Sequence, residues 1–425
     1  MKKLVLSALI ASSLVFTGCF KDDDTPIIIE ETTIINNNGG GDDGGEDCPI
    51  VAVSGAITEN TTWTNDNIYR INQKVVVDNG ATLTIEPGTI IKGAPGTGSL
   101  ASALIIARGS KINAVGTASE PIVFTSTSDN ILCGQTAGSN LDQNDRGLWG
   151  GLIVLGNAPC SFSGDITEAQ IEGIPADDTF GLYGGTDATD NSGVMSYISI
   201  RHGGALIGEG NEINGLTLGG VGNGTVINNI EVVANVDDGI EFFGGTVNAS
   251  NLLVWAQGDD ALDIDQAYSG TIDNAVVVLG DFSDHAFEID GPEGSATGSF
   301  VLQNATIIGN TVTENGEYAD YRSGATGSTS NIYAFGFKDS SDVELDNDGV
   351  ATNYNDGLLT FGAWEIVLPT GVTDVTTIFA NKAENVMVTG FGSTASAVTL
   401  DNNTVGATTS TLAWTYANAA GGLGF

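Results

Sequence analysis

Residues that commonly bind transition metals or anions are scarce in this 425-residue chain. It has four cysteines and two histidines, with no Cys-x-x-Cys pair, which argues against a zinc or haem site. Only 13 lysines and arginines stand against 53 aspartates and glutamates, giving a formal net charge of −40 at pH 7. Such a surface repels nucleic acids and polyanions and attracts cations. We therefore expect no nucleic-acid partner.

Long apolar stretches and helical periodicity are missing beyond the N-terminus. No later run is long enough to span a bilayer. Nine prolines accompany 59 glycines without a collagen period, and short β-branched runs alternate with turns, as in GATLTIEPGTIIKG from Gly80. Apolar runs of three to five residues between glycine-rich turns are typical of parallel strands. The sequence therefore predicts an all-β solenoid over residues 50–425.

One sequence motif occurs three times in the middle of the chain: NVDDGIEFFGG from Asn235, QGDDALDIDQA from Gln257 and FSDHAFEIDGP from Phe282. The first two copies start 22 residues apart (235 and 257), which is the length of one solenoid coil. A predicted strand lies before each copy of the motif, and an asparagine stands directly before that strand. Two later predicted strands also follow an asparagine. The five residues are Asn229, Asn251, Asn274, Asn304 and Asn331. Asparagine tolerates left-handed turns, and stacked amides can hydrogen-bond along the coil axis.

The motif predicts a column of carboxylates. Glu241, Asp263 and Glu288 align, each between two apolar residues, and equivalent residues of stacked coils lie at the strand spacing of about 4.8 Å. We expect these side chains to point outward from a strand, where a hard cation such as Ca²⁺ would suit them. The preceding acid pairs have a simpler interpretation, because Asp commonly caps turns.

The N-terminus predicts an exported lipoprotein. Lys2 and Lys3 precede an apolar run that ends in Gly18 and Cys19, typical of a signal peptide over residues 1–18. Its loss removes two positive charges and takes the net charge from −40 to −42. Residues 19–49 are rich in Asn, Gly and Asp and predict a flexible tether.

Gly-Cys at the end of the signal resembles the bacterial lipobox, which implies acylation of Cys19 and attachment to outer-membrane lipid. The following Lys21–Asp24 run resembles the export signal of Bacteroidetes lipoproteins displayed on the cell surface. An ordinary charged linker of a periplasmic lipoprotein is the alternative. Among the remaining cysteines we expect Cys133 to pair with Cys160 and Cys48 to stay free, although sequence cannot fix connectivity.

The body of the chain resembles the right-handed parallel β-helix, or pectin-lyase-like, fold. TLTIEPGTIIKG and GTASEPIVFTS are phrases common in such proteins, and the run from WGGLIVLGNAP to GDDALDID resembles β-helix lipoproteins of Bacteroidetes. This resemblance implies the fold but no activity.

The acid motifs are similar in part to those of the polygalacturonases, which are inverting glycoside hydrolases. The resemblance would make Asp259 the general acid, with Asp238 and Asp260 activating water. His285 stands at the family's histidine, but within Asp-His-Ala, and Arg322 lacks the family's lysine partner. The missing lysine and the acidic surface argue against a galacturonate substrate.

These observations favour a surface-exposed, lipid-anchored β-helix that binds an extracellular glycan or protein, with Ca²⁺ on its acidic face. An inverting glycoside hydrolase or polysaccharide lyase is the first alternative, and a structural or adhesive surface component is the second.

Overall fold

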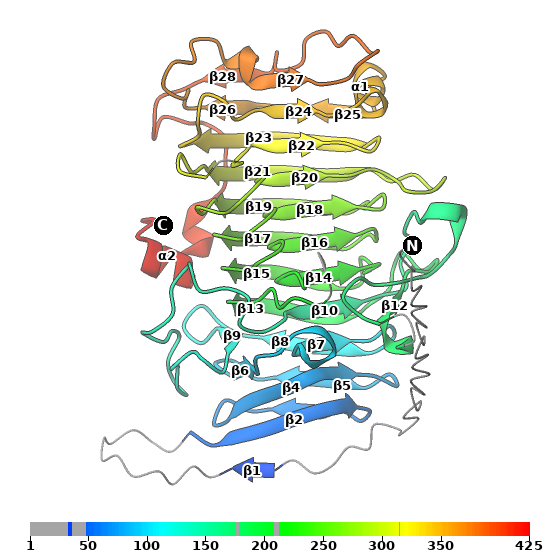
Figure 1. The fold of residues 1–425 in the computed structure, drawn as a ribbon, viewed down its shortest axis with the longest axis vertical. Coiled ribbons are helices and arrows are strands. Elements are labelled where there is room, and N and C mark those ends of the chain that lie inside the picture. Colours follow the sequence, from blue (N-terminus) through cyan, green and yellow to red (C-terminus); the bar gives the residue numbers. More distant parts are fainter. Residues whose placement is uncertain (1–32, 36–47, 176–177, 208–211, 314) are drawn as a thin grey trace, which may run out of the picture.

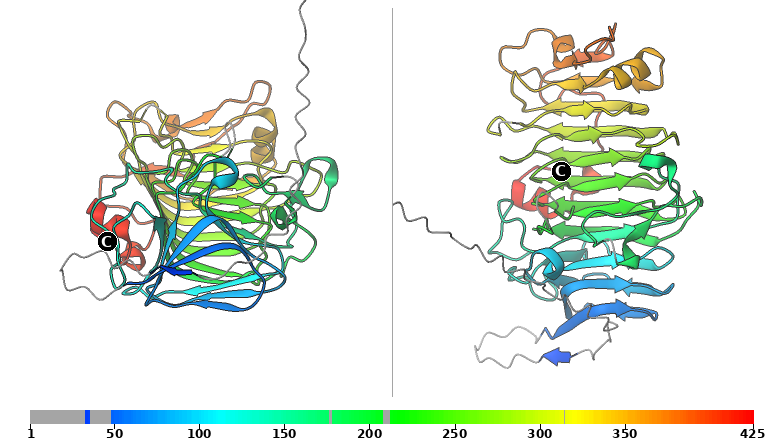
Figure 2. Two further views of the ribbon diagram at one scale, coloured as in Figure 1. Left: turned by 60° about the horizontal axis from the view of Figure 1, so that its bottom comes forward. Right: turned by 45° about the vertical axis from the view of Figure 1, so that its right-hand side comes forward.

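The computed structural model describes residues 33–35, 48–175, 178–207, 212–313 and 315–425. The predicted signal, Cys19 and the Lys21–Asp24 run lie outside these residues, as does most of the predicted tether. Within the described residues the coils stack along one axis as parallel rungs (Figures 1 and 2). The strands form one 26-stranded sheet that wraps around a continuous apolar core, and nearly all pairings are parallel. This confirms the predicted all-β solenoid and is consistent with the right-handed parallel β-helix.

Three ladders of strands run along the solenoid. The first ladder contains the C-terminal parts of β2 (Ile50–Ile57) and β4 (Ile68–Val77), then β7 (Ala103–Ile106), β10 (Leu152–Leu155), β14 (Leu216–Gly219), β16 (Ile240–Phe243), β18 (Leu262–Asp265), β20 (Phe287–Ile289), β22 (Ala319–Tyr321), β24 (Val343–Leu345) and β27 (Phe379–Asn381). Its inward side chains, such as Ile240, Phe242 and Leu262, are fully buried. Their outward neighbours carry the candidate site.

The second and third ladders share long strands that bend at one residue. These strands are β13 (Gly193–Arg201), β15 (Val226–Val233), β17 (Asn248–Trp255), β19 (Thr271–Val278), β21 (Phe300–Ile308) and β23 (Gly327–Phe335). The second ladder also contains β3 (Thr61–Trp63), β5 (Thr82–Ile85), β8 (Lys111–Val115) and β25 (Leu359–Phe361). The third also contains β6 (Ile90–Gly93), β9 (Ile122–Ser126), β26 (Trp364–Ile366) and β28 (Ala395–Ala397).

Asparagine makes the bend in five successive long strands. The five predicted asparagines all have left-handed backbone conformation: Asn229 (φ 53°), Asn251 (56°), Asn274 (62°), Asn304 (58°) and Asn331 (58°). The Asn274 amide donates to Asn251 Oδ1 at 2.7 Å, and the Asn331 amide donates to Asn304 Oδ1 at 2.9 Å. An amide both donates and accepts, so it can bond to its own copy on the next coil. The predicted stacking of asparagine amides is confirmed for two of the four successive pairs, whereas Asn304 donates to Asp273 instead.

Short elements decorate the solenoid. β1 (Thr33–Ile35) pairs antiparallel with β2, and β11 (Ala169–Gln170) pairs antiparallel with β12 (Leu182–Tyr183). The helices are α1 (Asp348–Asn355), α2 (Tyr416–Gly421) and the 3₁₀ turns η1 (Gly98–Leu100), η2 (Ser163–Asp165), η3 (Thr179–Gly181), η4 (Val375–Ile378) and η5 (Thr409–Leu412). No helix of the described ranges combines the length and apolarity needed to cross a membrane.

The C-terminal segment, residues 398–425, runs back along the solenoid from β28 to the middle coils, where α2 lies beside β15 and β17 (Figure 1). The Asp401 amide donates to the Tyr333 hydroxyl at 3.1 Å, and the Thr408 amide donates to Asn274 Oδ1 at 2.6 Å. Near its end, the Ala417 amide donates to the buried carboxylate of Glu231 at 2.7 Å. The segment therefore ties together coils that are far apart along the axis.

The predicted disulfide is wrong. Cys133 pairs with Cys48, across a Cα–Cα distance of 5.8 Å, and Cys160 is free. Cys48 lies just before β2, and the loop after β9 carries Cys133 back to the first coils, where Ile50, Ile68, Ile90 and Val123 pack nearby. Cys160 instead lies against the backbone of Phe243 and Gly244. Cys160 was predicted as the partner of Cys133 because the two are near each other in sequence. Solenoid stacking instead brings Cys133 beside Cys48, which is 85 residues away.

Candidate functional site

The predicted carboxylate column lies on the first ladder. Glu241 of β16, Asp263 of β18 and Glu288 of β20 are register partners on consecutive strands, which confirms the predicted stacking. The column continues with two residues that the three-copy alignment missed, Asp320 of β22 and Glu344 of β24. Both could have been found, because Ala-Asp-Tyr and Val-Glu-Leu repeat the motif's pattern of an acid between two apolar residues. Longer turns before these strands obscure the repeat.

Solvent barely reaches most of this column. The side chains point outward from the strands, as expected, but Glu241, Asp263 and Glu288 are only 6%, 9% and 7% exposed. Neighbouring polar side chains cover them, and the Asn214 amide, for example, donates to Glu241 Oε2. Burying like charges at this spacing is costly unless a proton or cation balances them.

A second stack of polar side chains fills the turns that precede the first-ladder strands. Each side chain accepts a hydrogen bond from the backbone of the next coil. Asn214 Oδ1 accepts from the Asp238 amide at 3.2 Å, Asp238 Oδ1 accepts from the Asp260 amide at 2.9 Å, and Asp260 Oδ1 accepts from the His285 amide at 2.7 Å. Asp238 and Asp260 therefore have a structural role in the turns, but each bonds to the equivalent turn of the next coil rather than capping its own turn. This role also explains why one residue of each acid pair is buried.

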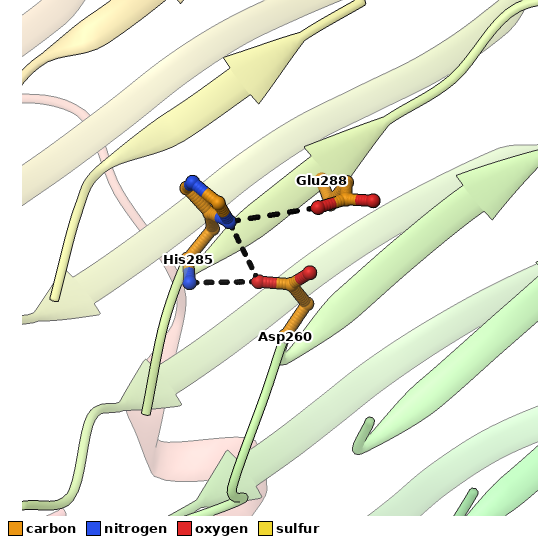
Figure 3. A group of neighbouring side chains, drawn as sticks. All are labelled: Asp260, His285 and Glu288. Carbon is orange, nitrogen blue, oxygen red and sulfur yellow. Dashed lines mark hydrogen bonds and ion pairs between the residues drawn. The ribbon is translucent and has the colours of Figure 1, made fainter. Parts of the chain in front are cut away.

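His285 supplies a positive charge to the third coil (Figure 3). Its Nδ1 lies 2.8 Å from Asp260 Oδ1 and 3.6 Å from Glu288 Oε2. Burial alone would lower the pKa of His285, but the hydrogen bond and charge of Asp260, with the charge of Asp284, outweigh burial and raise it to about 9. His285 is therefore an imidazolium at neutral pH.

Two more basic side chains form ion pairs with acids of the later coils. Arg322, just after β22, contacts Glu288 and donates from Nε to both oxygens of Asp290 at 3.1 Å. Lys382, just after β27, lies 2.9 Å from Asp342 Oδ2 and 3.1 Å from Glu344 Oε2. Glu288 and Glu344 therefore each have a protein cation within contact distance.

The first two coils of the column form no such ion pair within the described residues. There Asp238, Glu241 and Asp263 bring three carboxylates together, with one oxygen from each lying within 4.8 Å of the other two. Burial, together with the charges of the other two members or their neighbours, raises the pKa of all three well above the usual range. Asp263 Oδ1 is buried without a hydrogen-bond partner. We call these three residues the carboxylate triad.

The triad brings together three of the oxygen ligands that hard cations prefer. Its ligand atoms are all carboxylate oxygens, the preferred ligands of Ca²⁺ and Mg²⁺, and it lacks the nitrogen and sulfur ligands typical of zinc sites. The unpartnered Asp263 Oδ1 leaves at least one oxygen free to coordinate. Among the three residues predicted as a metal site, Glu241 and Asp263 belong to the triad, whereas Glu288 groups with Asp260 and His285.

A family model described as a pectate-lyase-like beta helix domain matches residues 55–419. The chain belongs to this pectate-lyase-like β-helix family. No curated protein and no solved structure matches the chain. Membership supports a carbohydrate-related surface protein or enzyme at the level of the family, without identifying a ligand.

The residues matched to polygalacturonase motifs differ in accessibility within this pectate-lyase-like domain. Asp238 and Asp260 are buried and engaged by backbone amides, whereas Asp259 is exposed. Partial desolvation by the surrounding protein, with the charges of Asp260 and Asp284, raises the pKa of Asp259 to about 6. Arg322 lies with His285 around Glu288. The five predicted residues thus occupy neighbouring coils, and Asp259 is the accessible carboxylate among them.

Three aspartates with raised pKa values predict that the stability of the metal-free pectate-lyase-like domain depends on pH. Burial, reinforced by neighbouring carboxylates, raises the pKa of Asp237, Asp265 and Asp320 to about 7, against roughly 4 in an unfolded chain. Between these values the folded state binds more protons than the unfolded chain, so the free energy of unfolding falls as pH rises. We expect the melting temperature in EDTA to be higher at pH 5 than at pH 8. Calorimetry showing the reverse order would contradict this assignment.

Proposed function

We propose that this protein is a lipid-anchored β-helix of the cell surface that binds an extracellular glycan and holds Ca²⁺ on its acidic face. Membership of the pectate-lyase-like family supports a carbohydrate-related role. The lipobox-like Gly18-Cys19 and the Lys21–Asp24 run support attachment and surface display. The acidic surface, which favours cations over polyanions, supports the metal.

The carboxylate triad is the observation that carries the cation proposal. Three buried acids converge at Asp238, Glu241 and Asp263, whereas Glu288 and Glu344 of the same column contact Arg322 and Lys382. Two unit charges about 5 Å apart repel by roughly 3 kcal/mol at an effective dielectric of 20. A bound Ca²⁺ would convert this repulsion into attraction, in the place that basic side chains take farther along the column.

The triad predicts that Ca²⁺ stabilises the protein. At a Ca²⁺ concentration about 100 times its dissociation constant, we expect the melting temperature to rise by roughly 3–5 °C over that in EDTA. Asp263→Asn removes a buried carboxyl that must otherwise repel its neighbours or take up a proton, so it should raise the melting temperature in EDTA at pH 8 and blunt the response to Ca²⁺. Scanning calorimetry measures both, and a melt indifferent to Ca²⁺ and EDTA would exclude the cation site.

Glu344→Gln is the matched control, because it neutralises a carboxylate of the same column that already pairs with Lys382. This change removes the attraction to Lys382 together with the repulsion from Asp320 and Glu317, so it should raise the melting temperature in EDTA less than Asp263→Asn does. The response to Ca²⁺ should stay as in the wild type. Equal behaviour of Glu344→Gln and Asp263→Asn would mean that the effect does not come from the triad.

Surface display is tested at the N-terminus. Replacing Lys21–Asp24 with alanines should leave Cys19 acylated but move the protein to the inward-facing leaflet of the outer membrane. Protease treatment of intact cells should therefore digest the wild type and spare the variant. If both are equally protected, the run is not a surface-export signal.

An inverting glycoside hydrolase is the second candidate, and the accessibility of Asp259 with its pKa of about 6 favours it. A general acid works best with a pKa near the working pH. Asp259→Asn should then reduce reducing-end release from any cleaved glycan by about 100-fold or more, while the melting temperature stays close to that of the wild type. Undiminished turnover by this variant would remove Asp259 from the mechanism.

A further inference from the structure

A groove lies on the turn side of the solenoid, apart from the outward face of the column. Its larger part, about 440 Å³, is lined by Asn144, Arg146, Val236, Gly258 and Phe282. A second hollow of about 190 Å³ shares Asn144 and Arg146 and reaches Asp281 and Asn310. The loop before β10 therefore forms one wall, and the turns of three successive coils form the other.

Phe282 is the most exposed aromatic side chain of the described residues, with 65% of its surface accessible. It lies in a turn that is two residues longer than its counterparts, because Asp284 follows Asn274 by ten residues whereas Asp259 follows Asn251 by eight. The Arg146 guanidinium lies 4.7 Å from the ring centroid, a cation–π contact that holds the ring in place. An aromatic ring that is held in place yet solvated provides a flat apolar surface for a ligand.

Polar groups surround this ring. The groove presents the amides of Gln143, Asn144 and Asn310 and the carboxylate of Asp281. Asp237 and Asp259 directly follow the lining residues Val236 and Gly258, and Asp284 follows Phe282 by two residues. Amides and carboxylates can together donate to and accept from hydroxyl groups. One basic residue, Arg146, stands among these acids, so polyanions are disfavoured.

We propose that this groove is a binding site for a neutral glycan, with one pyranose ring stacked on Phe282. The C–H face of a pyranose is apolar and flat and suits the aromatic ring, while its hydroxyl rim suits the surrounding amides and carboxylates. This inference rests on the proposed glycan-binding function and specifies the site and the ligand class. Its lining residues differ from the three carboxylates of the triad, so the glycan and the cation would be bound by different side chains.

Binding is measured by calorimetry with the wild-type protein and four probes: cellohexaose, mannohexaose, xylohexaose and hexagalacturonate. We expect at least one neutral hexasaccharide to bind, and hexagalacturonate to bind at least about tenfold more weakly. Phe282→Ala should weaken the neutral interaction by about tenfold or more, and Asn144→Ala should weaken it to a smaller extent. Both residues are exposed, so both variants should keep the wild-type melting temperature and Ca²⁺ response.

Leu358→Ala is the matched control, because Leu358 is 55% exposed and is not among the groove's lining residues. Its affinity for the neutral probe should equal that of the wild type. Unchanged affinity in Phe282→Ala, or preference for hexagalacturonate, would overturn the groove assignment while leaving glycan binding itself intact. If none of the four probes binds, both the groove and the glycan-binding function are contradicted, whatever the Ca²⁺ response.

Discussion

In-register stacking of the coils is the constraint on which the rest of this structure depends. Each parallel strand places its residues directly beside those of the next coil, so every outward position becomes a column with a spacing of about 4.8 Å. Each outward side chain must therefore pack favourably against the equivalent side chains of the neighbouring coils. Asn274 does so because its amide can donate to Asn251 and accept from Thr408. A carboxylate accepts only, and it stacks on another carboxylate only when a proton, a basic side chain or an ion lies nearby.

The acidic column meets this constraint differently along its length. His285, Arg322 and Lys382 approach it from turns and from later coils, and each contacts at least one of its neighbouring acids. The start of the column has only the polar cover of Asn214 and the backbone bonds of the turn stack. Basic side chains thus contact Glu288 and Glu344, whereas the triad, and Asp320 between those two glutamates, form no ion pair within the described residues. A difference of this kind along a regular scaffold is a more specific indication of function than a high acid content, which the whole chain shares.

The sequence was sufficient to predict the solenoid, the asparagine bends and the stacking of Glu241 on Asp263, because these follow from local patterns that repeat at coil length. It was not sufficient to predict burial of the column, since the covering groups come from other turns, as Asn214 and Arg322 do. The pairing of Cys48 with Cys133 was missed for the same reason: the long loop after β9 returns to the first coils, and no local pattern records that return. The later acids Asp320 and Glu344 have the same local pattern as the motif, but turns of variable length obscure the repeat there.

The returning C-terminal segment changes how the solenoid behaves as a chain of repeats. In a simple solenoid each coil contacts only its neighbours, so folding can spread from coil to coil in the order of synthesis. Here the binding surface for residues 401–417 includes Tyr333, Asn274 and Glu231, and it is complete only when coils from β15 to β23 have formed. The contacts of residues 401–417 therefore close a long-range loop, and long-range closure slows folding. A variant without residues 401–417 would lose the contacts that link coils from β15 to β23, and each coil would then contact only its neighbours.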